Sequence, residues 1–226
     1  MGKKRKKRKR LKIKSVLIFL LFILFLIGIA YALTLIKVRT YYVYNNTYLT
    51  DAEVLKELKL DKNSSFVTIN TYYEKSLIKK SKFIKDVKIK RTLDLEIKVD
   101  IKEYKILFYD SKSKKTVIEN GEAIDYLDTN SPVLVNSIDD KDVYKNLVKK
   151  MNKINNNVLS TISEISYSPN GIDKERFLLS MNDGNYVYVT LTKLSKINDY
   201  KKIIDSVENK KGILYLDYGN YFVPKE

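Results

Sequence analysis

The chain has 226 residues, 44% of them apolar, which is enough for one or two domains with real hydrophobic cores. Its net charge of +16 lies mostly at one end, because residues 1–14 hold ten lysines or arginines and no acid. The remaining 212 residues carry only +6 (33 basic minus 27 acidic). Such a weak net charge argues against a nucleic-acid-binding groove in that part of the chain. Cysteine and histidine are both absent, which excludes disulfides, a thiol nucleophile, and the commonest general base and transition-metal ligand.

An uncharged apolar run follows the basic tail, at residues 15–36. A helix of this length, rising about 1.5 Å per residue, spans the roughly 30 Å hydrocarbon core of a membrane, so we predict a transmembrane helix. By the positive-inside rule, the tail (1–14) then lies in the cytoplasm beside anionic headgroups, and everything after Ile36 lies outside. Ala30-Tyr31-Ala32 resembles a signal-peptidase site, but the apolar run exceeds the usual h-region of about 7 to 15 residues, so we favour an uncleaved anchor.

A compact module begins directly after the apolar run. Residues 38–44 are rich in β-forming residues, and Asn45-Asn46 indicates a turn. Thr50 and Glu53 have the spacing of a capping box, which predicts a helix beginning after Thr50. A second helix is expected over residues 71–82, with Thr71 as its cap.

The hydrophobic period then changes from about 3.6 to 2. Between residues 87 and 102 apolar side chains occupy most odd positions, and charged side chains occupy most even ones. This alternation predicts two strands with one buried and one wet face, joined by a reversal near 92–95. The module is therefore expected to be α+β, with a three-stranded sheet and two helices.

The order of parts in this module resembles the POTRA domain of the bacterial cell-division family FtsQ/DivIB. In that family a strand ending in V-x-G-N precedes a helix that starts at Thr or Ser. Here Val43-Tyr44-Asn45-Asn46 precedes Thr50, with Asn45 in the glycine's place, a residue that tolerates positive φ. The family's hairpin pattern is matched, with Asp94 in place of a proline, by Ile89, Arg91, Ile97, Val99, Ile101 and Glu103. The resemblance implies a POTRA-like domain over 37–104.

The rest of the chain, residues 105–226, reads as a mixed β domain with flanking helices. Short strands are expected near Lys105–Tyr109 and Thr116–Glu119, and Ser131–Leu134 resembles the short extended segment that follows this hairpin in the family. An amphipathic helix, capped by Asp139 or Asp140, carries Val143, Leu147, Met151 and Ile154. A β-meander is expected over Ile162–Tyr167, Arg176–Met181 and Tyr186–Leu191, then a helix over Lys193–Val207, and a last strand in 212–224. This order resembles the β domain of the same family.

We find no signature of catalysis, of a cofactor or of a metal site. Two Ser-x-x-Lys matches, at Ser76 and Ser111, are about what chance gives in so lysine-rich a chain, and no Lys-Thr-Gly accompanies them. Asp139-Asp140 is better read as helix-cap material than as a catalytic acid pair. We therefore expect a protein that is not an enzyme.

The family resemblance implies a bitopic divisome scaffold at the division septum. It implies binding to membrane-anchored FtsB (DivIC)-like and FtsL-like partners and, through them, indirect control of the septal peptidoglycan synthase, with no nucleic-acid partner. Two alternatives stay open: a membrane-anchored cell-wall enzyme or regulator, and a secretion accessory or sensor that shares only the POTRA module.

The last strand is the expected docking site for these partners. A terminal strand at a sheet edge exposes backbone groups that a partner strand can satisfy, and the resemblance implies that the FtsB-type partner binds in this way. The predicted contact residues are Tyr215, Leu216, Tyr218, Tyr221 and Phe222. Alternation assigns Ile213 and Tyr215 to one face and Leu214, Leu216 and Tyr218 to the other, without deciding which face is inward.

Overall fold

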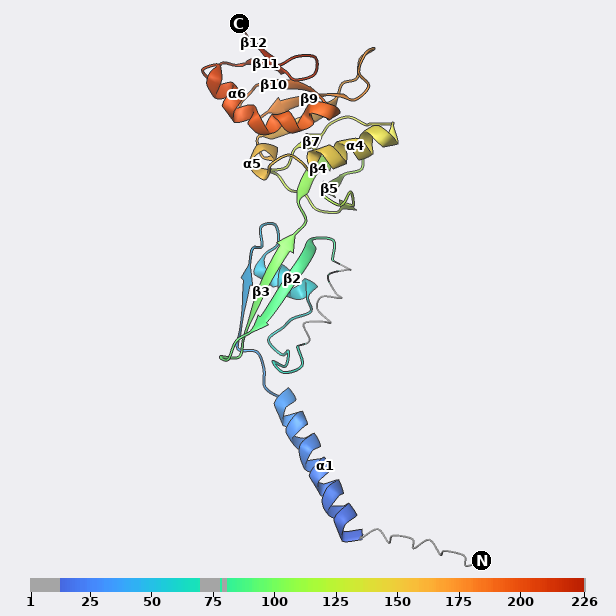
Figure 1. The fold of residues 1–226 in the computed structure, drawn as a ribbon, viewed down its shortest axis with the longest axis vertical. Helices are drawn as coiled ribbons and strands as arrows, with labels where there is room; N and C mark the ends of the chain where they lie inside the picture. Colours follow the sequence, from blue (N-terminus) through green and yellow to red (C-terminus); the bar gives the residue numbers. More distant parts are fainter. Residues whose placement is uncertain (1–12, 70–77, 79–80, 226) are drawn as a thin grey trace, which may run out of the picture. The chain divides into compact units, whose positions relative to one another are not determined.

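The computed structural model describes residues 13–69, 78 and 81–225, which fold as two compact units divided between Glu103 and Tyr104 (Figure 1). The predicted basic tail (1–14) and the helix expected over 71–82 fall largely outside the described residues. The first unit begins with α1 (Ile13–Thr34), which starts and ends two residues before the predicted span. None of its side chains is buried within the chain. The helix has 22 residues and is long and apolar enough to cross a membrane.

The first unit contains a three-stranded sheet in the order β1-β3-β2. Its strands are β1 (Thr40–Tyr44), β2 (Ile84–Arg91) and β3 (Glu96–Glu103), with β2 antiparallel and β1 parallel to β3. The odd-numbered apolar residues Val87, Ile97, Val99 and Ile101 form its core, together with residues of α2 (Asp51–Glu57), as the alternation predicted. The predicted reversal between β2 and β3 is also confirmed.

The turns of the first unit follow the local chemistry expected from the sequence. Thr50 and Glu53 form both hydrogen bonds of the capping box, and Asn45 has φ of +64°, the conformation its place in the motif requires. The Glu103 carboxylate accepts hydrogen bonds from the N–H groups of Thr47, Tyr48 and Leu49, at 2.8 to 3.0 Å. Glu103 thereby holds the loop between β1 and α2 against the end of β3.

The second unit is built on a nine-stranded mixed sheet in the order β12-β11-β10-β9-β8-β7-β4-β5-β6. Its strands are β4 (Ile106–Asp110), β5 (Lys115–Ile118), β6 (Ala123–Ile124), β7 (Val133–Leu134), β8 (Ile162–Tyr167), β9 (Arg176–Met181), β10 (Tyr186–Thr190), β11 (Gly212–Tyr215) and β12 (Tyr221–Pro224). The three strands of the meander start where the sequence predicted. The α+β fold class is confirmed.

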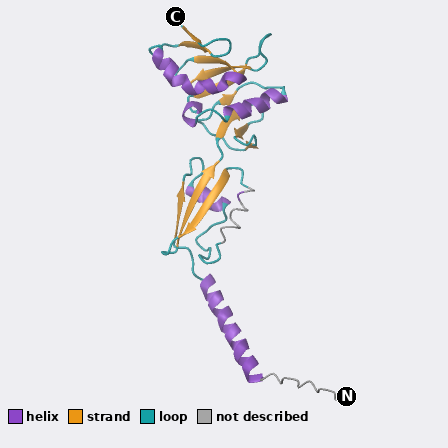
Figure 2. Ribbon diagram, in the orientation of Figure 1, coloured by secondary structure: helices purple, strands orange, loops and turns teal. Residues whose placement is uncertain are grey.

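Helical segments pack on this sheet: α4 (Lys141–Met151), α5 (Asn156–Leu159), the 3-10 helix η1 (Leu191–Asp199) and α6 (Tyr200–Ser206) (Figure 2). Asp140, not Asp139, caps α4. The single α-helix expected over 193–207 is instead divided, with a 3-10 segment before α6. The buried residues of that segment, Leu191, Leu194 and Ile197, recur every three residues, which is the period of a 3-10 helix.

Candidate partner-binding surface

The C-terminal segment is a hairpin, so the expectation of a single last strand is wrong. β11 pairs parallel with β10 and antiparallel with β12, and β12 is the outermost strand. The strand predicted across 212–224 is broken at Asp217, whose side chain is buried and held by other residues, and the chain reverses through residues 218–220. The exposed edge of the sheet therefore belongs to Tyr221–Pro224 and not to Ile213–Leu216.

The five predicted contact residues occupy three different environments. Leu216 is 1% exposed and packs in the unit's own core with Leu214, so it does not belong to the surface. Tyr215 is half-buried, on the opposite face of β11, and Phe222 is half-buried against the core. Tyr218 and Tyr221 are exposed, by 56% and 51%, but Tyr218 lies in the hairpin turn.

The hydrogen-bond pattern shows which backbone groups of β12 face outward. Leu216 N–H donates to the Tyr188 carbonyl and Gly212 N–H to Asn185 Oδ1, so the even-numbered residues of β11 face β10. Lys225 N–H donates to the Lys211 carbonyl, so odd-numbered residues join the two hairpin strands. Because bonded and non-bonded pairs alternate in an antiparallel ladder, the N–H and C=O of Phe222 and the C=O of Pro224 point away from β11. These groups form an edge on which a further strand can bind.

A row of tyrosines crosses the outer strands on the face that carries Tyr215. Tyr188, Tyr215 and Tyr221 are direct cross-strand neighbours. Their ring centroids lie 5.4 Å (Tyr188 to Tyr215) and 4.7 Å (Tyr215 to Tyr221) apart, with interplanar angles of 26° and 12°. The guanidinium of Arg176 lies 3.7 Å from the Tyr188 ring centroid. We call Tyr188, Tyr215 and Tyr221 the tyrosine row. Arg176 covers its Tyr188 end, and its Tyr221 end lies at the sheet edge.

A groove of about 600 Å³ lies on the other face of the hairpin. Its apolar lining comes from both the hairpin and the helical segment: Leu214, Leu216, Phe222, Ile203 and Val207. Polar side chains, among them Lys196, Asp199 and Lys202, also line it. The edge strand thus has a tyrosine row on one face and a groove of mixed apolar and polar lining on the other.

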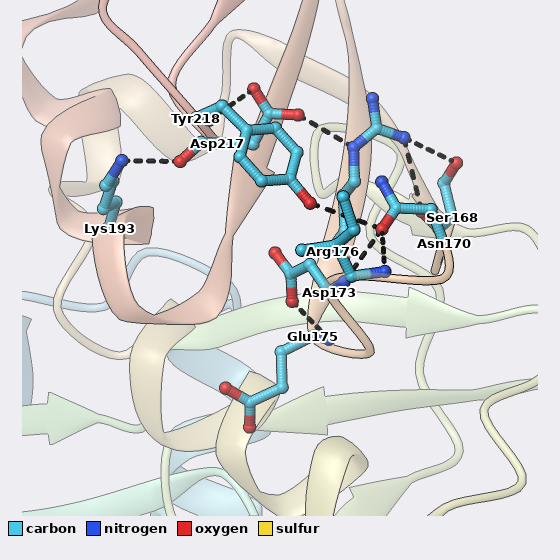
Figure 3. A network of polar contacts seen from close by, with 9 residues as sticks. Ser168, Asn170, Asp173, Glu175, Arg176, Lys193, Asp217 and Tyr218 are labelled. Atoms are coloured by element: carbon cyan, nitrogen blue, oxygen red, sulfur yellow. Dashed lines mark hydrogen bonds and ion pairs between the residues drawn. The ribbon is translucent and has the colours of Figure 1, made fainter.

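A buried ion pair fixes the hairpin turn (Figure 3). Arg176 Nε donates to Asp217 Oδ2 at 2.8 Å, with side chains 14% and 2% exposed. Lys193 Nζ donates to the Asp217 carbonyl at 2.5 Å, and Tyr218 N–H donates to Asp217 Oδ1 at 2.9 Å. The strands β9 and β11 and the segment η1 therefore meet at Asp217, and the course of the chain toward β12 is set there.

The pKa of Asp217 lies below its ordinary value. Burial alone would raise it, but hydrogen bonds from Arg176 and from the Tyr218 N–H, together with the Arg176 charge, outweigh burial. The pKa of Arg176 is raised: burial opposes the charged form, and the hydrogen bond and charge of Asp217 favour it more strongly. Both residues are therefore charged at neutral pH.

A second buried polar residue, Asn185, fixes the start of β11. Its Oδ1 accepts the Gly212 N–H at 2.8 Å, and its Nδ2 donates to Asp183 and to the Tyr200 hydroxyl. Tyr200 donates in turn to Asp183 at 2.8 Å, and burial, with this hydrogen bond, raises the pKa of Tyr200. The sequence indicates the turn at 182–185 but not the role of Asn185, because its contact with Gly212 joins residues 27 positions apart.

The described residues do not bring metal-ligating side chains together. No group of three or more acidic side chains in the described part of the chain is arranged to hold a metal ion. The buried carboxylate of Asp217 is already satisfied by Arg176 and the Tyr218 N–H. The surface presents outward backbone groups, aromatic rings and apolar side chains.

The chain is similar to known proteins over most of its length. The family model described as "POTRA domain, FtsQ-type" matches residues 37–104. Cell division protein DivIB of Bacillus anthracis is 30% identical over 196 residues, which are 83% of this chain and 73% of that protein. DivIB of Bacillus subtilis (strain 168) is 30% identical over 203 residues, 86% and 77% of the two chains.

A solved structure of the major extracytoplasmic domain of DivIB from Geobacillus stearothermophilus aligns with 48% of this chain and 97% of its own, at 24% identity and a TM-score of 0.39. The identity and coverage of the Bacillus relatives establish the family, which the sequence motifs had indicated. The chain belongs to the DivIB family of cell division proteins and carries an FtsQ-type POTRA domain.

Proposed function

We propose that this protein is a bitopic divisome scaffold that binds membrane-anchored division proteins of the FtsB (DivIC) and FtsL type. In this proposal the outer edge of β12 receives an extended segment of the FtsB-type partner, and the assembly helps control septal peptidoglycan synthesis. The observation that carries the proposal is the open edge of β12, with the backbone groups of Phe222 and Pro224 directed outward.

The location that goes with this function is the cell membrane at the division septum. The 22-residue helix α1 supports a single membrane anchor, and the ten basic residues among the first 14 support a cytoplasmic N-terminus. The POTRA-like domain (37–104) and the β domain (105–226) are then both outside the cell, where the FtsB-type and FtsL-type partners would meet them.

The proposed function has no catalytic step. The chain has neither histidine nor cysteine, and the buried carboxylate of Asp217 serves a structural ion pair. The peptidoglycan chemistry belongs to the synthase, and this protein acts on it only through the partners it holds.

The test compares two variants of Phe222, one that loses the side chain and the outward backbone N–H and one that loses only the side chain. Phe222→Pro and Phe222→Ala both remove the ring, but only proline also removes the N–H that faces the partner. The N–H bonds that join β11 and β12 belong to odd-numbered residues, so both variants keep them. We expect Phe222→Ala to retain measurable capture of the full-length FtsB-type partner in detergent, and Phe222→Pro to lose it.

Equal capture by the two variants, at equal melting temperatures, would show that the β12 edge is not the docking site. In cells, depletion of the protein should give filaments without septa, and a tagged copy should locate at midcell. Normal septation after complete depletion would contradict the divisome role itself.

A further inference from the structure

We infer that the tip of the hairpin between β2 and β3 (residues 92–95), with Leu93 at its apex, inserts shallowly into the outer leaflet of the membrane that α1 crosses. This inference rests on the membrane anchor of the proposed function. It goes beyond that function because it assigns a lipid-binding surface to the POTRA-like domain.

The hairpin tip lies beside the point where the chain leaves α1. Because β1 and β3 are parallel and begin side by side, the turn before β3 lies at the end of the sheet where β1 begins. Only residues 35–39 separate that end from Thr34, the last residue of α1. The Arg39 N–H donates to the Leu95 carbonyl at 2.9 Å, so the hairpin tip is held against this linker.

The linker is too short to carry this end of the domain far from the bilayer. The 22 residues of α1, at about 1.5 Å each, fill the roughly 30 Å hydrocarbon core, and the headgroup region beyond it is only about 5 to 7 Å thick. The Ile36 carbonyl already accepts the Phe66 N–H at 2.8 Å. At most about 7 Å of chain therefore separates the helix from the domain, which holds this end of the domain near the headgroups.

The exposed aliphatic side chains of the domain gather at this same end. Among the described residues from 37 to 103, Leu93 is 102% exposed, Val67 41% and Leu95 37%, and the other leucines, isoleucines and valines are buried or half-buried. Val67 belongs to this end because its carbonyl accepts a hydrogen bond from Arg91, the last residue of β2. Contact with lipid would remove the apolar area of these side chains from water.

The turn itself departs from the usual chemistry of hairpin turns. The Thr92 N–H donates to the Glu96 carbonyl at 3.0 Å, and Leu95 between them has φ of +59°. Hairpin loops of this length usually place glycine or asparagine in such a left-handed position. Leu95 adopts it at a cost, and the fully exposed Leu93 gains nothing from the fold. Contact with lipid gives both leucines an apolar environment.

Charged neighbours limit the depth of insertion. Asp94 is exposed next to Leu93, and Lys37 and Arg39 are exposed in the linker. Ionised groups are costly in the hydrocarbon core but are tolerated among headgroups, where basic side chains also bind lipid phosphates. We therefore expect Leu93 to reach the upper part of the acyl chains while these charges stay at the level of the headgroups.

The experiment uses the full-length protein in phosphatidylcholine–phosphatidylglycerol nanodiscs, with and without lipids brominated near the headgroup end of their acyl chains, which quench tryptophan on contact. The chain has no tryptophan of its own, so a single introduced one reports its own position. Leu93→Trp places it at the hairpin tip. The matched control is Tyr44→Trp, exposed at the far end of β1, about 13 Å along the strand. We expect at least about twofold quenching for Leu93→Trp and little for Tyr44→Trp.

A second measurement asks whether Leu93 itself holds the tip in lipid, because tryptophan favours membrane interfaces by its own chemistry. The chain has no cysteine, so Lys90→Cys accepts a single nitroxide label on the exposed side of β2. With Leu93 in place, the label should be at least about twofold less accessible to a water-soluble relaxation agent than in the double variant with Leu93→Gln. Near-ultraviolet circular dichroism and melting temperature check that each variant stays folded.

Equally weak quenching of Leu93→Trp and Tyr44→Trp, with normal capture of the FtsB-type partner, would place the tip in water and overturn the inference alone. So would equally strong quenching of both, since the domain would then lie along the bilayer, and so would equal accessibility of the label with Leu93 and with Leu93→Gln. If the emission of Leu93→Trp shifts only when the FtsL-type partner is added, a protein covers the tip and lipid does not. Extraction of the full chain from membranes by carbonate would remove the anchor, and the proposed function would fall as well.

Discussion

The two edges of the nine-stranded sheet are built in opposite ways. At one end β6 has only two residues, Ala123 and Ile124, and the chain folds back at once: the Tyr126 N–H donates to the Ile124 carbonyl at 3.0 Å. At the other end β12 has four residues and follows a turn fixed by a buried ion pair. Because open sheet edges promote unwanted pairing, proteins usually shorten or cover them. The β6 edge is closed in this way, whereas the β12 edge is open and supported from behind.

The difference shows that a strand at an open edge must be held by more than its hydrogen bonds to the one neighbouring strand. β12 pairs only with β11 within this sheet, and β11 is positioned by Asn185 at its start and by Asp217 just after its end. Pro224 also shortens the edge, because it offers an outward carbonyl but no N–H. The result is an edge with few outward hydrogen-bonding groups.

The largest expected effect comes from breaking the support of β12. Asp217→Asn leaves the Arg176 guanidinium, whose side chain is 14% exposed, without its charged partner. Removing one member of a buried ion pair costs about 3 to 5 kcal/mol of unfolding free energy. We expect this loss in denaturant unfolding of the full chain, accompanied by faster amide exchange in β12.

The matched control lies at the other edge of the sheet. Lys115 and Asp125 form an ion pair beside β6, at 3.5 Å, with side chains 43% and 77% exposed. Exposed pairs contribute little, so Asp125→Asn should change stability by less than about 1 kcal/mol. Equal losses for Asp125→Asn and Asp217→Asn would contradict the contrast between a closed and a supported edge.

A smaller effect is expected from separating β12 from β11. A Cβ on Gly212 would lie 2.2 Å from the Val223 carbonyl oxygen and 2.9 Å from the Pro224 Cα, and both are backbone atoms that cannot rotate away. Gly212→Ala should therefore cost about 1 to 3 kcal/mol, as overpacking does, and expose the β12 amides to exchange. Gly171→Ala, where a Cβ meets nothing within 4 Å, is the control and should leave the β12 amides protected.

Acid should reversibly weaken the ion pair between Arg176 and Asp217. The folded pKa of Asp217 lies below its ordinary value, so its stabilising contribution is present above the unfolded-state pKa of about 4 and declines as pH falls through the folded pKa. We expect the melting temperature of the unmodified protein to fall more steeply below about pH 4 than that of Asp217→Asn, which has no proton to gain at this site. Parallel pH profiles for the two proteins would show that Asp217 does not contribute in this way.

Local patterns predicted much of the fold because they are decided within a few residues. The capping box at Thr50, the positive φ of Asn45 and the two-residue period of β2 and β3 all follow from sequence neighbours. The last strand was harder. Its β-forming residues suggested one continuous strand, and the break at Asp217 depends on Arg176, a residue 41 positions earlier.

The candidate surface was only partly predictable for the same reason. The sequence indicated the C-terminal aromatic residues, but periodicity alone did not show that Leu216 faces the core and Tyr221 the solvent. Tyr188 was missed as part of the surface because its stacking on Tyr215 depends on a parallel pairing of β10 with β11 across an intervening helical segment. One available signal was a lone acid, Asp217, within an otherwise apolar strand pattern: a buried charge requires a partner.

Lysine substitutions at the two sheet edges should change stability least but should differ clearly in their effect on partner binding. Val223→Lys and Ala123→Lys each place a charge on an exposed side chain of an edge strand, and surface changes of this kind usually alter stability by no more than about 0.5 kcal/mol. An edge lysine opposes strand pairing, because a partner strand must desolvate it. We therefore expect Val223→Lys to weaken capture of the FtsB-type partner and Ala123→Lys to leave it unchanged, measured on full-length protein in detergent. If Ala123→Lys weakens capture and Val223→Lys does not, the partner binds at the β6 edge, and the open edge of β12 needs another occupant.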